Sequence, residues 1–126
     1  MAAAILVVDD EEDVREVIAL SLRNRGYEIE TAAGGTEALA RMRERPFDLV
    51  LLDVMMPMVT GIEVCRLAKA DPNLAGVPIV FLTAKGGGDA LAEGLEAGAL
   101  MYLQKPFTTE KLVRLIDAAL GTEPNW

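Results

Sequence analysis

Five short apolar runs, rich in β-branched residues, alternate along this chain with segments of helical spacing. The runs lie at about 4–8, 28–32, 48–52, 78–83 and 100–103, and their length and composition predict strands. Residues 49–52 are apolar at every position, which is typical of a strand covered on both faces in a parallel sheet. Right-handed crossovers then place helices on both sides of that sheet. The sequence predicts an α/β fold, a doubly wound (βα)5 domain with a five-stranded parallel sheet.

Threonine and glycine residues mark several of the expected helix ends. Gly26 suits the end of the first helix, where a left-handed residue is often required. Thr60 and Glu63 have the spacing of a capping box, and Thr108 can cap the last helix. That last helix carries one apolar stripe, made by Leu112, Leu115, Ile116 and Ala119.

Composition narrows the class of protein. The 126 residues suit one domain, and a hydrophobic content of 52% argues for a folded globule. The single cysteine, Cys65, excludes an internal disulfide, so a cytoplasmic location is expected.

No apolar run approaches the roughly 20 residues of a membrane helix. A net charge of −8 repels nucleic-acid backbones and anionic lipid, so we expect no direct nucleic-acid binding and no membrane association. The basic group Arg41, Arg43 and Arg45 is interpreted as a solvated helix face.

Polar residues stand at the ends of four of the five apolar runs. Asp9 and Asp10 follow the first run, and Asp53 follows the third. Thr83 ends the fourth run, and Lys105 follows the fifth. Because residues just past the carboxyl ends of parallel strands line a shared crevice, we expect these five side chains to meet there.

The second run, at about 28–32, is not followed by a polar residue of this kind, unlike the other four. This difference indicates the order of the strands in the sheet. With the second strand at the edge, in the order 2-1-3-4-5, the four strands that end in polar residues are neighbours. A strand spacing of about 4.8 Å then places Asp10 and Thr83 one strand from Asp53, with Lys105 two strands away and within reach. Each residue alone has an ordinary explanation: Asp9 and Asp10 as helix caps, Asp53 as a turn residue, Thr83 as a strand-end hydroxyl and Lys105 as a lysine before proline. Their conjunction at neighbouring strand ends favours a site.

Three carboxylates, a hydroxyl and an ammonium group suit a divalent cation and a phosphoryl group. Clustered carboxylates repel one another unless a cation lies among them, and Mg²⁺ prefers such oxygen ligands. We expect Asp10 and Asp53 to bind Mg²⁺ directly, with Asp9 holding a metal-bound water or acting from outside the coordination shell. A central carboxylate can also attack phosphorus. Lys105 and the Thr83 hydroxyl would each then bind one phosphoryl oxygen, and Mg²⁺ a third.

The segments around these residues resemble the response regulator receiver domain of two-component signal transduction, over about residues 3–120. The matching segments are residues 5–11 (ILVVDDE), 53–57 (DVMMP) with Gly61 following, 82–85 (LTAK) and 102–107 (YLQKPF). The resemblance implies a flavodoxin-like fold. It also implies that Asp53 takes a phosphoryl group from a phosphohistidine on a sensor histidine kinase or a histidine phosphotransfer protein, and becomes a 4-aspartylphosphate. Mg²⁺ would be held by Asp10, Asp53 and the backbone carbonyl of Met55, and the Lys105–Pro106 bond would be cis.

The resemblance further implies a phosphorylation-driven switch and not an enzyme with an external substrate. Thr83 would move toward the phosphate, and Tyr102 would swing into the space that opens. The face formed by the fourth helix, fifth strand and fifth helix would then change its preference for a downstream effector protein or for an output domain of the same chain. Val14 and Val17 in the first helix are candidates for docking the kinase.

We expect residues 1–121 to form the receiver domain and 122–126 to be a tail or the stub of a linker, with a stand-alone receiver favoured over an excised one. Two other functions compete. A phosphatase with an aspartate nucleophile would resemble a pattern with a second aspartate where this chain has Met55. A flavin-binding electron-transfer domain would need a Ser/Thr/Gly-rich phosphate loop where residues 9–13 are acidic.

Overall fold

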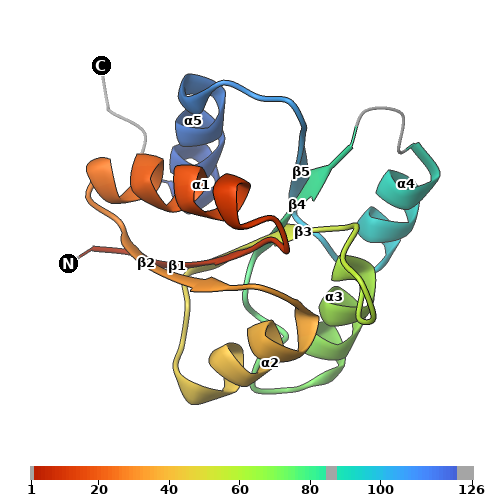
Figure 1. Cartoon of the computed structure of the whole chain (residues 1–126). Helices are drawn as coiled ribbons and strands as arrows, with labels where there is room; N and C mark the ends of the chain where they lie inside the picture. Colours follow the sequence, from red (N-terminus) through yellow and green to blue (C-terminus); the bar gives the residue numbers. More distant parts are fainter. Residues whose placement is uncertain (1, 85–87, 122–126) are drawn as a thin grey trace.

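The computed structural model describes residues 2–84 and 88–121 and contains a five-stranded parallel sheet between two layers of helices (Figure 1). In chain order the elements are β1 (Ala4–Val8), α1 (Glu12–Asn24), β2 (Glu28–Ala32), α2 (Gly35–Glu44), β3 (Leu49–Asp53), α3 (Gly61–Ala70), β4 (Ile79–Thr83), α4 (Gly88–Glu96), β5 (Met101–Gln104) and α5 (Thr109–Leu120). All pairs are parallel and the strand order is β2-β1-β3-β4-β5. The fold class and strand order expected from the sequence are confirmed. None of the helices in these described ranges has the length and apolar character needed to cross a membrane.

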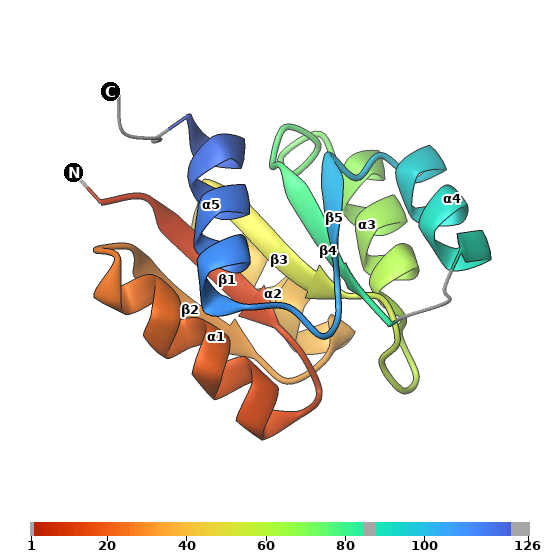
Figure 2. The same ribbon diagram turned by 90° about the horizontal axis from the view of Figure 1, so that it is seen from above.

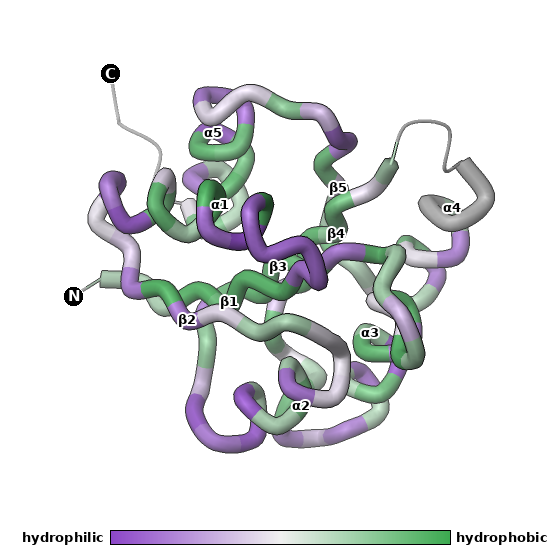
Figure 3. Tube along the Cα trace, in the orientation of Figure 1, coloured by the Kyte–Doolittle hydropathy of each residue, from purple (hydrophilic) through white to green (hydrophobic). Residues whose placement is uncertain are grey.

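Two hydrophobic cores lie on opposite faces of the sheet. Helices α1 and α5 cover one face, and α2, α3 and α4 cover the other (Figures 1 and 2). Alternate residues of β1 serve the two cores: Leu6 points toward α2 and α3, whereas Ile5 points toward α1 and α5. Strands β1, β3 and β4 are buried along their whole length, and Figure 3 shows them as predominantly hydrophobic. Burial on both faces explains why residues 49–52 show no alternation of polar and apolar positions.

The helix ends agree with the residues that marked them in the sequence. The Thr60 side chain accepts a hydrogen bond from the Glu63 amide at 3.2 Å, and the Thr108 side chain accepts one from the Lys111 amide at 3.1 Å. Gly26 has a φ of 100° just after α1, a conformation that favours glycine. These local signals fix where α1 ends and where α3 and α5 begin.

The arginines in and just after α2 remain partly solvated, but they are also paired. Arg41 and Arg45 both contact Glu30 on the edge strand β2, at 3.4 and 2.6 Å, and Arg43 lies 4.0 Å from Asp71. Exposed pairs of this kind contribute roughly 0–1 kcal/mol each. The pairs with Glu30 tie α2 to β2.

A buried carboxylate joins α5 to the turn between α1 and β2. Asp117 is 4% exposed and accepts hydrogen bonds from Arg25 Nε at 3.0 Å, from Arg25 Nη2 at 2.7 Å and from the Tyr27 hydroxyl. These bonds satisfy a charge that would be costly to bury alone. They fix the position of α5 relative to α1.

We predict that Gly61→Ala lowers the free energy of unfolding by about 1–3 kcal/mol, because the backbone would have to shift. A Cβ at Gly61 would lie 2.9 Å from the Val54 Cα and closer still to the carbonyl oxygen of Asp53. Urea denaturation measures the change. Gly76→Ala is the matched control, since nothing lies within 4 Å of the Cβ it would add. Equal stability of the two variants would contradict the prediction.

Candidate functional site

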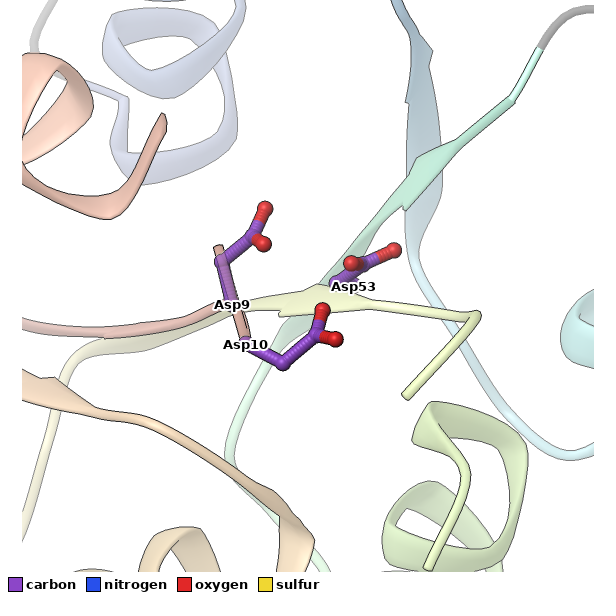
Figure 4. A group of neighbouring side chains, drawn as sticks. All are labelled: Asp9, Asp10 and Asp53. Atoms are coloured by element: carbon purple, nitrogen blue, oxygen red, sulfur yellow. The ribbon is translucent and has the colours of Figure 1, made fainter. Parts of the chain in front are cut away.

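Three aspartates converge at the carboxyl end of the sheet (Figure 4). Asp9 and Asp10 follow β1, and Asp53 is the last residue of the neighbouring strand β3. Carboxylate oxygens of the three lie within 4.8 Å of one another. Asp9 is fully buried and Asp53 is 5% exposed, whereas Asp10 is exposed. The structure therefore brings together the three carboxylates that the sequence placed at one crevice.

Lys105 reaches this carboxylate cluster from the far side of β4. Its Nζ lies 2.9 Å from Asp9 Oδ2, 3.5 Å from Asp53 Oδ2 and 4.0 Å from Glu11 Oε1. The Lys105 amide donates to the Thr83 carbonyl at 2.7 Å, and the Lys105–Pro106 bond is cis, as the family resemblance implied. The long side chain spans the two-strand separation that the strand order requires.

The protein engages both carboxylate oxygens of Asp9. Oδ1 accepts a hydrogen bond from the Glu11 amide at 2.9 Å, and Oδ2 accepts one from Lys105. Glu11 occupies the N-cap position of α1 without a side-chain cap, so neither Asp9 nor Asp10 caps the helix directly. The oxygens of Asp53 accept longer hydrogen bonds, from the Met55 amide at 3.2 Å and from Lys105 at 3.5 Å, and Asp10 is exposed, so Asp9 is the least available of the three aspartates to bind a cation directly.

Arg15 supports the site from α1, and it was missed in the sequence. Its Nη1 donates to the backbone carbonyl of Asp9 at 2.9 Å, which holds the segment between β1 and α1 against the helix. A basic residue in the second turn of a helix gives no sequence signal of the carbonyl it will reach.

The pKa of Asp53 is raised from 3.8 to about 6. Burial is the largest cause because it disfavours the charged form, and the negative charge of Asp9 adds to it. Lys105 and the Met55 amide act in the opposite direction without cancelling the increase. Burial alone would lower the pKa of Lys105, but the hydrogen bond to Asp9 and the surrounding carboxylates raise it above its ordinary value. A cation among these carboxylates would favour the ionised form of Asp53.

The remaining candidate residues surround the carboxylates. Thr83 ends β4, the strand next to β3, and is 5% exposed. The Met55 amide donates to Asp53 Oδ1 at 3.2 Å, while the Met55 side chain is 68% exposed. Tyr102 lies on the edge strand β5 with 43% of its surface exposed. Lys85 and the expected tail at 122–126 lie outside the described residues.

An open, mainly apolar groove runs beside the site between α1 and the segment after β5. Val14, Val17 and Ile18 of α1 line one side, and Phe107 lines the other. Lys105 also lines the groove and so joins it to the carboxylates, and Glu11 and Asp13 line it as well. Val17 is 60% exposed although it is apolar. The two valines singled out in the sequence therefore share one surface next to Asp53.

A doubly wound domain with three aspartates and a lysine at the carboxyl edge of its sheet has the features of a phosphoryl-accepting signalling domain. The chain belongs to the response regulator receiver domain family, whose sequence model matches residues 5–117. It serves as the phosphoacceptor domain of two-component signalling, which is the role of that family.

Named relatives and solved structures agree with this assignment. The chain is 45% identical over 120 residues to the DNA-binding response regulator MtrA of Mycobacterium tuberculosis, which covers 95% of this chain and 51% of MtrA. It is 45% identical over 116 residues to the phosphate regulon transcriptional regulatory protein PhoB of Pseudomonas aeruginosa, covering 92% and 51% of the two chains. The chain thus spans about half the length of the curated relatives it matches.

Two solved structures match nearly the whole chain. The chemotaxis response regulator CheY4 of Vibrio cholerae superimposes with a TM-score of 0.90 at 36% identity, covering 95% of this chain and 100% of CheY4. The receiver domain of NtrX from Brucella abortus gives a TM-score of 0.87 at 30% identity, covering 94% and 99% of the two chains. Both the fold and the family are therefore shared over almost the full length.

We predict that Asp53→Asn stabilises the metal-free protein at about pH 7.5 by about 1–3 kcal/mol, at roughly 1.4 kcal/mol per pKa unit. Because the folded pKa of Asp53 exceeds 3.8, the folded state binds more protons between about pH 4 and pH 6. Stability is therefore lost as the pH rises through that window, and asparagine removes the loss. Urea denaturation in the presence of a chelator measures the difference.

The gain from Asp53→Asn should shrink as the pH falls toward about 4, where Asp53 is protonated in the folded state. Asp13→Asn, on the exposed first turn of α1, is the control and should give no gain. A gain that is the same at both pH values would show that ionisation of Asp53 is not its cause.

Proposed function

We propose that Asp53 is the residue of this receiver domain that accepts the phosphoryl group, from a phosphohistidine on a sensor histidine kinase or a histidine phosphotransfer protein. One observation carries the proposal: a buried carboxylate at a strand end lies beside two further carboxylates and 3.5 Å from an ammonium group. An Asp53 carboxylate oxygen attacks phosphorus, the phosphorus–nitrogen bond breaks, and the histidine leaves with the electron pair. The product is a 4-aspartylphosphate.

We further propose that the carboxylate cluster holds Mg²⁺ through Asp10, Asp53 and the backbone carbonyl of Met55. The donor set fits the ion, because it consists of hard oxygen atoms with an excess of negative charge. When bound, Mg²⁺ supplies charge neutralisation between the carboxylates and an incoming phosphoryl group. Asp9 is fully buried and both its oxygens accept hydrogen bonds at 2.9 Å, shorter than those to Asp53, so it would act from outside the coordination shell or through a metal-bound water.

Two side chains are proposed to bind the phosphoryl oxygens. Lys105 lies close to Asp53 and carries a positive charge that its neighbouring carboxylates reinforce. Thr83 stands at the end of the adjacent strand with a hydroxyl group that can donate. Phosphoryl transfer depends mainly on positioning and charge stabilisation, and these residues can supply both.

The proposed output is a population shift of the α4-β5-α5 face. Thr83 would move toward the phosphate on Asp53, and Tyr102, exposed on β5, would turn inward into the space that opens. The partner of the changed face would be a downstream effector protein or an output domain. The DNA-binding description of MtrA is consistent with an output domain in a longer chain.

In this proposal the domain acts only on itself. Its chemistry is limited to phosphorylation of Asp53 and hydrolysis of the product, in the cytoplasm, with residues 1–121 as the folded receiver unit. An aspartate-dependent phosphatase is disfavoured because an exposed methionine, Met55, occupies the position of the second aspartate that such an enzyme would need.

We predict Mg²⁺-dependent labelling of Asp53 by a small phosphodonor such as acetyl phosphate. Intact-mass measurement should show one adduct of about 80 Da, the mass of one phosphoryl group replacing a proton. The adduct should be lost in Asp53→Asn and in the presence of a chelator, and it should persist in Asp13→Asn. Labelling that survives Asp53→Asn would exclude Asp53 as the phosphoacceptor.

We also predict that Val17→Glu blocks phosphoryl transfer from a histidine kinase but leaves labelling by acetyl phosphate intact. A charge in the apolar groove would oppose docking of the kinase, whereas a small donor does not need the groove. A panel of purified, autophosphorylated histidine kinases identifies the donor that transfers fastest to the wild type.

Leu20→Glu is the matched control for Val17→Glu. Leu20 lies on the same helix and has the same exposed fraction of 60%, but it is outside the groove. Transfer to Leu20→Glu should stay within about threefold of wild type, the range expected away from an interface centre. Equal loss of kinase-dependent and acetyl phosphate labelling in Val17→Glu would point to misfolding and would contradict docking at the groove.

A further inference from the structure

Arg15 makes an unusual contact for an arginine near the start of a helix. Its side chain is half-buried, and its Nη1 donates to the Asp9 carbonyl at 2.9 Å. Glu11 and Glu12 lie four and three residues earlier, at the spacing that favours ion pairs along a helix. Arg15 nevertheless forms no ion pair with any carboxylate of residues 2–84 and 88–121. The guanidinium group therefore binds a backbone carbonyl although acidic side chains lie nearby on the helix.

The other polar atoms of Asp9 are also engaged. Its amide donates to the Ala32 carbonyl at 3.2 Å, which continues the pairing of β1 with β2. Its carboxylate accepts hydrogen bonds from the Glu11 amide and from Lys105, both at 2.9 Å. Asp9 is thus held at its amide, its carbonyl and its side chain, and Arg15 provides the contact to the carbonyl.

Asp10, the next residue, lies between two peptide groups that these hydrogen bonds hold. The Asp9 carbonyl and the Asp10 amide belong to one planar peptide unit, so Arg15 restrains the plane that leads into Asp10. The Glu11 amide belongs to the plane that follows Asp10, and the Asp9 carboxylate restrains that plane. Because both planes are held, the direction of the Asp10 Cα–Cβ bond is fixed by its surroundings.

The Asp10 side chain has no comparable support of its own. It is exposed, and its carboxylate accepts no hydrogen bond and forms no ion pair within the parts of the chain that the structure describes. One of its oxygens nevertheless lies within 4.8 Å of oxygens of Asp9 and Asp53. Figure 4 shows the side chains of Asp9 and Asp10 leaving the backbone in different directions. The place of the Asp10 carboxylate in the cluster therefore depends on its backbone.

We propose that Arg15 is a positioning residue for Mg²⁺, because it holds the Asp9 carbonyl and so directs the Asp10 carboxylate toward Asp53. This proposal rests on the Mg²⁺ site proposed above. Mg²⁺ requires near-ideal octahedral geometry, and groups that orient metal ligands typically change metal affinity by about 10- to 100-fold. A guanidinium group has no acceptor for a metal ion, so Arg15 acts only through Asp9 and Asp10.

The sign of the expected effect separates this role from simple electrostatics. Arg15 is positively charged, so removal of its charge would by itself strengthen the binding of a nearby cation. Loss of positioning acts in the opposite direction and weakens binding. A purely structural role of Arg15 would lower the stability of the domain without changing its affinity for Mg²⁺.

Titration of the unphosphorylated protein with Mg²⁺, followed by amide chemical shifts in nuclear magnetic resonance spectra, measures this affinity without a phosphodonor. We expect Arg15→Met, which removes the donor but keeps a long side chain, to raise the dissociation constant for Mg²⁺ about tenfold. Arg15→Ala, which favours the helix, should show the same loss and decides the question if Arg15→Met does not fold. Arg15→Lys keeps a charged donor and should bind Mg²⁺ at least about threefold more tightly than Arg15→Met.

Arg23→Met is the matched control for Arg15→Met. Arg23 also lies on α1 and donates to a backbone carbonyl, that of Ile29 at 3.3 Å, but Ile29 lies on β2, which carries none of the clustered aspartates. The substitution removes the same charge and the same kind of hydrogen bond. The dissociation constant for Mg²⁺ should therefore stay within about twofold of wild type.

Labelling by acetyl phosphate gives a second readout. Arg15→Met should raise the Mg²⁺ concentration for half-maximal labelling about tenfold. The rate at saturating Mg²⁺ should stay within about threefold of wild type, because Asp53 and Lys105 are unchanged.

Unchanged or tighter binding of Mg²⁺ by Arg15→Met and Arg15→Ala would overturn the proposal. An equal loss of affinity in Arg23→Met would also overturn it, as would equal affinities of Arg15→Met and Arg15→Lys. If the wild type binds no Mg²⁺, the proposed metal site fails and the role of Arg15 fails with it. If the wild type binds Mg²⁺ but acetyl phosphate does not label it, the phosphoacceptor role of Asp53 fails, while the Mg²⁺ affinities still decide the role of Arg15.

Discussion

The properties of the site follow from three carboxylates that the fold holds close together at the carboxyl end of the sheet, although their negative charges repel one another. Two of them, Asp9 and Asp53, are almost completely withdrawn from water, and the raised pKa of Asp53 shows that burial and the nearby charge of Asp9 together disfavour its ionised form. Lys105 offsets part of this cost by lying between them, but it does not remove it. Because the three carboxylates carry more negative charge than Lys105 neutralises, the site is suited to bind a divalent cation and then a phosphoryl group.

Much of the fold and the positions of the polar residues could be predicted from the sequence, because both follow from local patterns. The uninterrupted apolar run at 49–52 indicates a strand buried on two faces, and a parallel sheet brings all strand ends to one edge. Long-range pairing could not be read in the same way. Nothing in the sequence indicated that Arg15 would reach the Asp9 carbonyl, or that Asp117 would accept bonds from Arg25. Such partners are set by how helices pack onto the sheet.

The positive φ of Met58 was missed for a different reason. No sequence pattern indicates it, because the hydrogen bonds that close the loop between β3 and α3 hold this one residue in a left-handed conformation. The sequence therefore predicted which polar residues meet at the carboxyl end of the sheet, whereas the structure shows which surfaces around Asp53 are left uncovered. The groove that Val17 lines and the exposed side chain of Met55 are two such surfaces.

The ion pairs along β2 have a consequence for assembly. An open sheet ends in a strand whose outer backbone groups have no neighbouring strand, and such an edge can recruit a strand from another chain. Glu30 with Arg41 and Arg45 places partly solvated charge on β2, on the face that α2 covers and next to this edge. Pairing of another strand with β2 would require removal of water from these charged side chains. This cost opposes polymerisation of the protein through the β2 edge, even at high protein concentration. Raising the ionic strength screens these pairs and weakens the protection.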